Sequence, residues 1–317
     1  MTSPSAAPSP EVVCLGETMV MLVPEDARPL GADSRLVLRA GGAESNVAIS
    51  LARLGHSTRW ISALGDDPLA QLIRDELTAA GVDISCVSTH PQAATGLYLK
   101  DPQGATTSVH YYRRGSAASH LDAHDVQPSM VGDARVVHLS GTTPALSDSC
   151  RRLTRAVVRD RVLGGATVSF DVNYRPKLWP VAEAGAELAD LARQADIVFV
   201  GRDEAETLWG TATAQQVRAF LPEPSVLVVK DGAVGATSFH GRDAWSAPSR
   251  RVPVVETVGA GDAFAAGWLS GHLRGLGPER SLQLGHLVAS RAVQAVGDCP
   301  DLPGRDELDA VLDGKTP

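Results

Sequence analysis

The sequence lacks the features that several protein classes require. Its 317 residues carry a formal net charge of −8, so a basic surface of the kind that binds nucleic acid is not expected. No apolar run approaches the length of a membrane span, and no charged-then-apolar leader opens the chain. These absences predict a cytoplasmic protein with neither nucleic acid nor a membrane as its partner.

Cysteine is scarce, and a common phosphate-binding motif is missing. The cysteines at 14, 86, 150 and 299 form no C-x-x-C pair and have no histidine cluster nearby, so structural thiols are expected rather than disulfides or a metal site. No Gly-x-x-x-x-Gly-Lys-Ser/Thr sequence occurs, so any phosphate chemistry must use an architecture other than a P-loop.

The overall composition is that of a globular protein, with 44% hydrophobic and 21% charged residues. Residues 1–10 are rich in Ser, Ala and Pro and are predicted to be a disordered tail. The remaining length allows about two domains or one large α/β domain.

Short apolar strands alternate with longer helical runs, which predicts βαβ units and a mostly parallel sheet flanked by helices. Strands are expected at 12–15, 60–63, 136–139, 167–171, 197–200 and 226–230. Helices are expected at 45–54, 68–80, 149–162, 183–192, 204–209, 214–220, 261–273, 281–296 and 307–312. Segments 19–39 and 95–113 read as extended, with turns at Pro24, Gly31 and 102–104, and predict a small separate sheet or lid.

The most informative segment is Glu256-Thr-Val-Gly-Ala-Gly-Asp-Ala-Phe264, where a loop becomes a helix. Gly259 and Gly261 let several backbone N–H groups turn toward one point, and the helix N-terminus adds its positive dipole end. The segment therefore predicts a phosphate seat. Asp262 would repel a phosphate and is better interpreted as a base that deprotonates an attacking hydroxyl. The alternative is an ordinary helix N-cap.

Other candidate residues follow the predicted strands. Gly16 and Glu17 come after the first strand, residues 173–175 after another, and Asp231-Gly232 after the strand at 226–230. Ligands of open α/β sheets bind outside the carboxyl ends of the strands. This convergence favours the interpretation of the chain as a kinase, in which Asp262 deprotonates a hydroxyl that attacks a phosphoryl group.

Two segments make the chain similar to the ribokinase-like (PfkB) family of sugar kinases. They are Gly41-Gly-Ala-Glu-Ser-Asn-Val-Ala-Ile-Ser-Leu-Ala-Arg-Leu-Gly55 and Glu256-Thr-Val-Gly-Ala-Gly-Asp-Ala-Phe-Ala-Ala-Gly267. The resemblance covers about residues 11 to 312. It implies an α/β core with a β-sheet lid and ATP-dependent phosphorylation of a sugar-like hydroxyl. A kinase domain is thus expected at 11–317, with lid segments at about 18–40 and 92–115.

The resemblance also implies roles around the phosphates. Asp262 would be the catalytic base, while Gly259, Ala260 and Gly261 would supply N–H groups to the transferring phosphoryl group. Nucleotide contacts are expected at Lys230, Gly232, Gly235, Gly259 and Gly261, and the helix around 286–290 would border the adenine. The family often has Asn-x-x-Glu where this chain has Gly201-Arg-Asp-Glu204. The kept Glu204 would organise Mg²⁺ through water, and the missing amide puts direct contact at residue 201 in doubt.

Within the family, the chain most resembles 2-keto-3-deoxygluconate kinases, through segments 16–20, 96–99, 111–117 and 171–179. Neutral-sugar relatives usually carry an aspartate where this chain has Met21, which cannot hold a pair of hydroxyls. Substrate contacts are implied for Gly41, Gly42, Asn46, Tyr98, Tyr111, Arg113 and Arg175. The two guanidinium groups match a carboxylate, so a sugar acid is the expected substrate.

Alternatives exist for several of these residues. If these residues do not contact a substrate, Arg113 is expected to be solvated, Tyr98 to pack within a sheet, and Asn46 to cap a helix. Asp171 would pair with Lys177 or Arg175.

The expected reaction is Mg²⁺- and ATP-dependent phosphorylation of 2-keto-3-deoxygluconate at its 6-hydroxyl. The alternatives are a fructokinase-like or other neutral-sugar kinase, a nucleoside kinase, and a non-catalytic sugar- or nucleotide-binding protein. Exposed lid edges predict a homo-oligomer.

Overall fold

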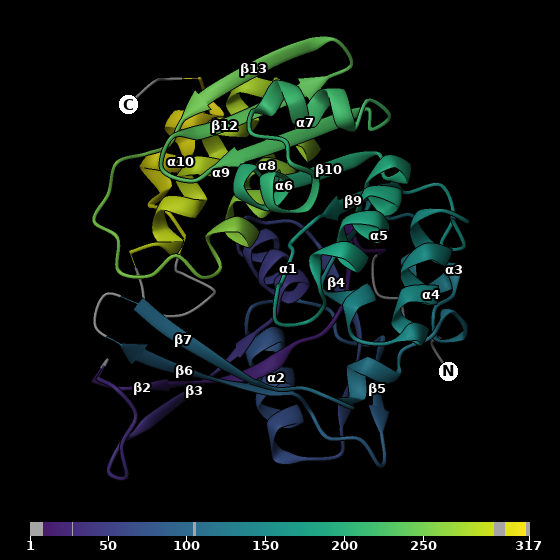
Figure 1. Ribbon diagram of the computed structural model, residues 1–317, viewed down its shortest axis with the longest axis vertical. Coiled ribbons are helices and arrows are strands. Elements are labelled where there is room, and N and C mark those ends of the chain that lie inside the picture. Colours follow the sequence, from purple (N-terminus) through teal and green to yellow (C-terminus); the bar gives the residue numbers. More distant parts are fainter. Residues whose placement is uncertain (1–8, 27, 104–105, 295–301, 315–317) are drawn as a thin grey trace, which may run out of the picture.

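The computed structural model describes residues 9–26, 28–103, 106–294 and 302–314. Within these residues a nine-stranded sheet runs through the molecule in the order β13-β12-β11-β10-β9-β8-β1-β4-β5 (Figure 1). The strands are β1 (Val12–Leu15), β4 (Thr58–Gly65), β5 (Val87–His90), β8 (Val136–Ser140), β9 (Thr167–Asp171), β10 (Ile197–Gly201), β11 (Val226–Asp231), β12 (Gly235–His240) and β13 (Asp243–Pro248). Neighbours from β11 to β5 pair in parallel, whereas β12 and β13 add antiparallel pairs at one edge.

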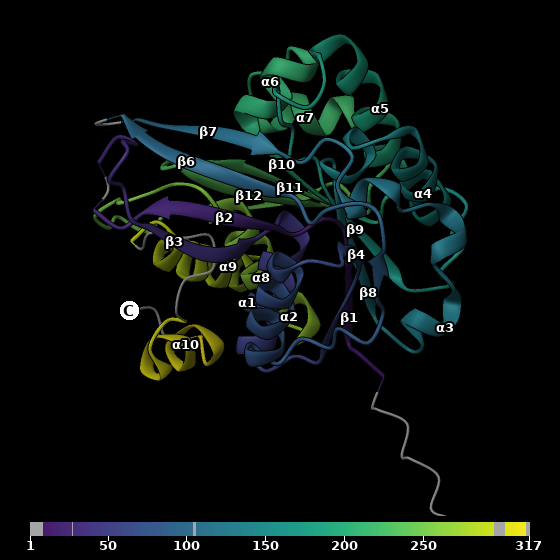
Figure 2. The ribbon, with the colours of Figure 1, turned by 90° about the horizontal axis from the view of Figure 1, so that it is seen from below.

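Helices cover both faces of this sheet (Figure 2). One face carries α1 (Ala43–Arg53), α2 (Pro68–Ala79), α8 (Ala260–Leu273) and α9 (Pro278–Ala292). The other carries α4 (Asp148–Val158), α5 (Val181–Gln194), α6 (Arg202–Trp209) and α7 (Ala214–Phe220), and the short α3 (Pro128–Val131) and α10 (Arg305–Leu312) lie at the periphery.

The side chains of β1 alternate between the two cores, as the period of a strand requires. Val12 and Cys14 pack with the α1, α2 and α8 side, while Val13 and Leu15 pack with the α4 and α5 side. Strands buried on both faces read as continuous apolar runs, so the buried parallel strands β1, β4, β8, β9, β10 and β11 were predictable. The predicted α/β fold class is confirmed.

The lid is a separate four-stranded sheet in the order β3-β2-β6-β7. Its strands are β2 (Met19–Pro24), β3 (Leu36–Gly41), β6 (Leu97–Gln103) and β7 (Thr106–Tyr112). It lies at one end of the main sheet, beside the helices α1 and α2 (Figures 1 and 2). Met19, Met21, Val23 and Tyr98 form a small apolar cluster on one of its faces.

Several predicted boundaries differ from the structure. The helix predicted to reach residue 162 ends at Val158, and Arg161 takes a left-handed φ of 53° while its guanidinium binds the carboxylate of Asp196. Pro102 was predicted in a turn but lies inside β6, opposite Thr107. The predicted helix 281–296 ends at Ala292, and its last two residues lie outside the described part.

Strands β5, β12 and β13 were not predicted because their sequences have no sustained apolar run or clean alternation. Of the predicted tail, residues 1–8 fall outside the described residues, and Pro10 is buried. Cys14, Cys86 and Cys150 are free thiols, while Cys299 lies outside the described part. Among the helices that the structure describes, none has the length and apolar character needed to cross a membrane.

Candidate active site

A cleft of about 800 Å³ lies where the lid faces the carboxyl ends of the parallel strands. It brings together every residue that the sequence predicted for the base, the phosphates, the substrate, the nucleotide and the metal. These are Gly41, Gly42, Asn46, Tyr98, Tyr111, Arg113, Arg175, Glu204, Lys230, Gly232, Gly235, Gly259, Ala260, Gly261 and Asp262. Residues more than 200 positions apart in the chain therefore share one cavity.

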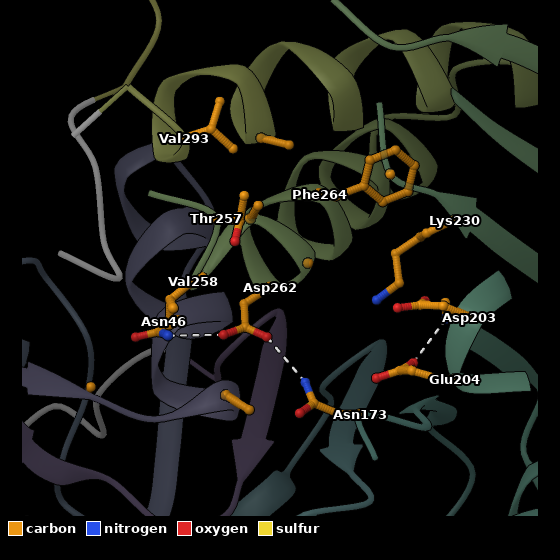
Figure 3. Close-up of a pocket in the computed structure, with 18 of the residues that line it drawn as sticks. Asn46, Asn173, Asp203, Glu204, Lys230, Thr257, Val258, Asp262, Phe264 and Val293 are labelled. Atoms are coloured by element: carbon orange, nitrogen blue, oxygen red, sulfur yellow. Dashed lines mark hydrogen bonds between the residues drawn. The ribbon is translucent and has the colours of Figure 1, made fainter. Parts of the chain in front are cut away.

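Asp262 lies in the first turn of α8, but it does not cap that helix. The N-cap is Gly259, with a left-handed φ of 80°, and Asp262 is the third helical residue. The residue is 7% exposed, and its carboxylate accepts from the Nδ2 groups of Asn46 at 2.9 Å and Asn173 at 3.2 Å (Figure 3). The N-cap alternative for Asp262 is therefore wrong. Asn46 is the fourth residue of α1 and not its N-cap, which is Gly42, but its Oδ1 accepts from the backbone N–H of Gly42 at 3.4 Å. Asn46 therefore contacts both the start of the helix and Asp262.

Burial governs the protonation of Asp262. Loss of hydration raises the pKa of its carboxyl to about 7, with the charge of Asp171 acting in the same direction. The hydrogen bond from Asn46 and the positive charges of Arg175 and Lys230 oppose this rise. A carboxylate that titrates near neutral pH suits a general base.

The turn before α8 forms a positive seat beside Asp262. Gly259 adopts the left-handed conformation that a glycine reaches without strain, and the first N–H groups of the helix have no partner within it. Lys230 Nζ lies 3.4 Å from the place where a Cβ on Gly261 would stand. Burial lowers the pKa of Lys230, but the charges of Asp171 and Glu204 outweigh it and raise that pKa, so the ammonium stays charged. This is a seat for an anion.

Glu204 lies across the cleft from Asp262, in the first turn of α6. Its Oε2 accepts from the backbone N–H of Gly201 at 2.8 Å, and burial raises the pKa of its carboxyl against the charge of Lys230. Asp203 also lines the cleft. Among the described residues, no group of three or more His, Cys, Asp or Glu side chains forms a metal site. One or two carboxylates fit Mg²⁺, which keeps several waters and binds phosphates.

Arg113 is held rather than solvated. Its side chain is 9% exposed and its Nε donates to Glu17 Oε2 at 2.6 Å, while Glu17 itself is buried and also accepts from Ser116. The solvated alternative for Arg113 is wrong. Arg175 is 42% exposed, and its guanidinium lies 3.8 Å from Glu204, so its ion pair is looser.

The lid contributes aromatic and glycine residues to the same end of the cleft. Tyr98 and Tyr111 line it with their rings 5.8 Å apart, although Tyr98 is also part of the apolar cluster of the lid. A Cβ on Gly42 would stand 2.3 Å from the carbonyl oxygen of Glu17. The backbones at the start of α1 and after β1 can therefore approach only because residue 42 is glycine.

The opposite end of the cleft is more apolar. Val252, Val254, Phe264 and Val293 line it together with His286, Ala289 and Ser290 of α9. Gly232 and Gly235 lie at this end, and a Cβ on Gly235 would stand 2.4 Å from the carbonyl oxygen of Ala247. Gly235 is thus required by the packing of β12 on β13. Such an apolar slot suits the flat face of a base.

The sequence did not predict which residues bind and orient the side chains of Lys230 and Asp262. Asp171 pairs with Lys230 at 2.7 Å, and not with Lys177 or Arg175 as expected; Lys177 donates to the carbonyl oxygen of Val109 instead. Asn173, which contacts Asp262, has a positive φ of 39°. The only signal in the sequence was that residues 16–17 and 171–175 follow predicted strands, and this position does not say which side chains bind one another.

Comparisons with known proteins identify the family of the chain. The model of the pfkB family carbohydrate kinases matches residues 9–305. A 2-dehydro-3-deoxygluconokinase of Bacillus subtilis (strain 168) is 38% identical over 313 residues, which cover 95% of this chain and 95% of the relative. These matches confirm the resemblance seen in the sequence.

Solved structures share the whole architecture. A PfkB protein from Polaromonas sp. JS666 is 34% identical with a TM-score of 0.85, covering 95% of this chain and 100% of that one. A sugar kinase from Pyrococcus horikoshii in complex with ATP is 26% identical with a TM-score of 0.81, covering 93% and 96%. The chain belongs to the pfkB family of carbohydrate kinases.

Proposed function

We propose that the chain transfers the γ-phosphoryl group of ATP to the 6-hydroxyl of 2-keto-3-deoxygluconate. The observation that carries the proposal is one cleft that joins a buried base at the start of α8 to two arginines at the lid end. The similarity to the Bacillus subtilis enzyme supports this substrate, and the ATP complex of the Pyrococcus horikoshii kinase supports the donor.

In this mechanism Asp262 takes the proton of the 6-hydroxyl while that oxygen attacks the γ-phosphorus and the bond to the ADP oxygen breaks. The N–H groups at 259–261 and the ammonium of Lys230 offset the negative charge of the transferring group. Asn46 and Asn173 hold the carboxylate so that its remaining lone pairs face the cleft. Glu204, with Asp203 beside it, would hold Mg²⁺ through water, and the ion would neutralise the phosphates.

The lid end of the cleft accounts for an acidic substrate. Arg113 is already neutralised by Glu17, so Arg175 is the cation with the weaker internal partner and the better one for a carboxylate. Tyr98, Tyr111, Gly41 and Gly42 would contact the hydroxyl and keto oxygens. Met21 is fully buried in the apolar cluster of the lid, where it offers no acceptor for a pair of sugar hydroxyls.

The lid also supports the proposal of a homo-oligomer. Its order leaves β3 and β7 as edge strands, and Leu38 on β3 and Tyr112 on β7 are 38% and 63% exposed. Exposed apolar edges favour association with a second copy of the chain. A cytoplasmic location is part of the proposal, because free thiols suit a reducing compartment.

An ATP-turnover assay with 2-keto-3-deoxygluconate beside fructose, ribose and gluconate tests the proposal. Turnover confined to the keto-deoxy acid is expected. Turnover with fructose or ribose instead would leave the role of Asp262 intact and refute the account of the lid end. No turnover with any acceptor would favour a binding protein on the kinase fold.

A further inference from the structure

Asp171 is a buried carboxylate that the mechanism above does not use. It ends strand β9, is 2% exposed, and is not among the residues that line the cleft. Its Oδ1 accepts from the backbone N–H of Asn173 at 3.1 Å, and its Oδ2 accepts from Lys230 Nζ at 2.7 Å. Each oxygen therefore binds a residue that does line the cleft.

The first of these contacts fixes the backbone beside the base. Asn173 has a φ of 39°, a left-handed conformation that costs a non-glycine residue free energy unless its surroundings hold it. The bond from its N–H to Asp171 closes a local turn of the kind that aspartate stabilises. In this conformation the Asn173 amide reaches Asp262 Oδ1 at 3.2 Å.

The second contact fixes the position of a cation. Lys230 has a long, flexible stem, and its ammonium would otherwise be free to follow any anion in the cleft. Bound to Asp171, the ammonium lies against Gly261 in the first turn of α8. Figure 3 shows Lys230, on β11, and Asn173, in the loop after β9, on the side of Asp262 away from Asn46.

We propose that Asp171 is the positioning residue of the phosphoryl-transfer site. Its bond to Asn173 orients the base Asp262, and its bond to Lys230 directs the Lys230 ammonium toward the transferred group. Both contacts act on the first turn of α8, where Asn173 reaches Asp262 and Lys230 lies beside Gly261. The proposal rests on the kinase reaction proposed above and adds a residue that never touches the substrate.

The alternative is a structural ion pair, since a buried carboxylate loses stability whenever its partner is removed. A matched control exists in Glu187 of α5, a carboxylate that is also buried and is paired with Arg155 away from the cleft, with its Oε1 2.8 Å from Nε. Asp171→Asn and Glu187→Gln each remove one such charge while keeping the shape of the side chain.

The test compares steady-state kinetics of the two variants at a temperature where circular dichroism shows both folded. Asp171→Asn is expected to lower kcat by about 10²-fold with smaller changes in both KM values, as loss of oriented transition-state contacts does. Glu187→Gln is expected to stay near the wild type. A kcat for Asp171→Asn close to that of Glu187→Gln would overturn the proposal.

The pH profile gives a second readout, because it follows the protonation of the base itself. The charged groups that act on Asp262 include Arg175, Lys230 and Asp171, and Asp171 is the one that raises the pKa of Asp262. Asp171→Asn is therefore expected to shift the acid limb of kcat/KM to lower pH, and an unmoved limb would contradict the proposal.

Asn173→Gly serves if Asp171→Asn fails to fold, because glycine keeps the positive φ available while it removes the side chain with its amide. An unchanged kcat in this variant would refute the part of the proposal in which Asn173 orients Asp262. The wild-type rate with whichever acceptor it phosphorylates best is the reference throughout. A wrong substrate would show in the wild type, whereas a wrong role for Asp171 would show only in the variants.

Discussion

At the scale of single residues, the site depends on one carboxylate made basic by its surroundings. Asp262 loses hydration inside the cleft, which raises its pKa, and two amides from distant parts of the chain hold both of its oxygens. The amides position the carboxylate without neutralising it. Burial and orientation thus act together on the group that we propose as the base.

Asp262→Asn is expected to lower kcat by about 10²–10⁴-fold, because an amide cannot take the proton of the acceptor. ATP binding should persist, since the seat at the start of α8 is built from backbone N–H groups. Turnover assays and calorimetric titration with ATP would measure both effects. Turnover close to wild type would end the assignment of Asp262 as the base.

The pKa of about 7 for Asp262 also predicts the pH dependence. A base works when it is unprotonated, so kcat/KM for the acceptor at saturating ATP should fall about tenfold per pH unit below pH 7 and level off above it. The carboxyl group of a sugar acid titrates well below this range, so the limb belongs to the enzyme. A profile flat down to pH 5 would contradict the raised pKa.

At the scale of secondary-structure elements, the sequence was sufficient wherever an element has its own periodic pattern. Strand β9 and helix α7 have the predicted bounds, because an apolar run or an amphipathic helix is a local property. Strands β12 and β13 are defined by their pairing on an already formed edge. The pairing of Asp171 with Lys230 depends on β9 and β11 flanking β10, which no local pattern encodes.

The lid is tied to the phosphate seat by a pair of charges from two different elements. Lys100 of β6 donates to Glu256, in the loop that leads to α8, at 2.7 Å, and their side chains are 2% and 12% exposed. Lys100→Met should lower the free energy of unfolding by about 3–5 kcal/mol, because it breaks a largely buried ion pair by removing one of the two charges.

Urea denaturation measures this loss, and Lys100→Met combined with Glu256→Leu is the control. Replacing both charges by apolar groups should restore much of the stability. If Lys100→Met alone were as stable as the wild type, the ion pair between Lys100 and Glu256 would not stabilise the attachment of the lid.

At the scale of the whole molecule, we propose two roles for the lid sheet. One of its faces closes the cleft, and its edge strands β3 and β7 pair with a second copy of the chain. Sedimentation equilibrium is expected to show a dimer or a higher homo-oligomer for the wild-type chain. Leu38→Lys together with Tyr112→Glu places charges on the exposed apolar positions of both edge strands and should shift the equilibrium to monomer. A wild-type monomer at micromolar concentration would refute association through the lid.

The central claim is that a sugar acid is recognised at the lid end and phosphorylated by the base at the start of α8. The most direct test is the ratio of kcat/KM for 2-keto-3-deoxygluconate to that for fructose, measured in the wild type and in Arg175→Ala. We expect the ratio to fall by about 30-fold or more in the variant, because loss of one charge-assisted contact costs about 2 kcal/mol or more, while KM for ATP changes little. An equal loss for both sugars, or an equal rise in KM for ATP, would contradict recognition of a carboxylate by Arg175.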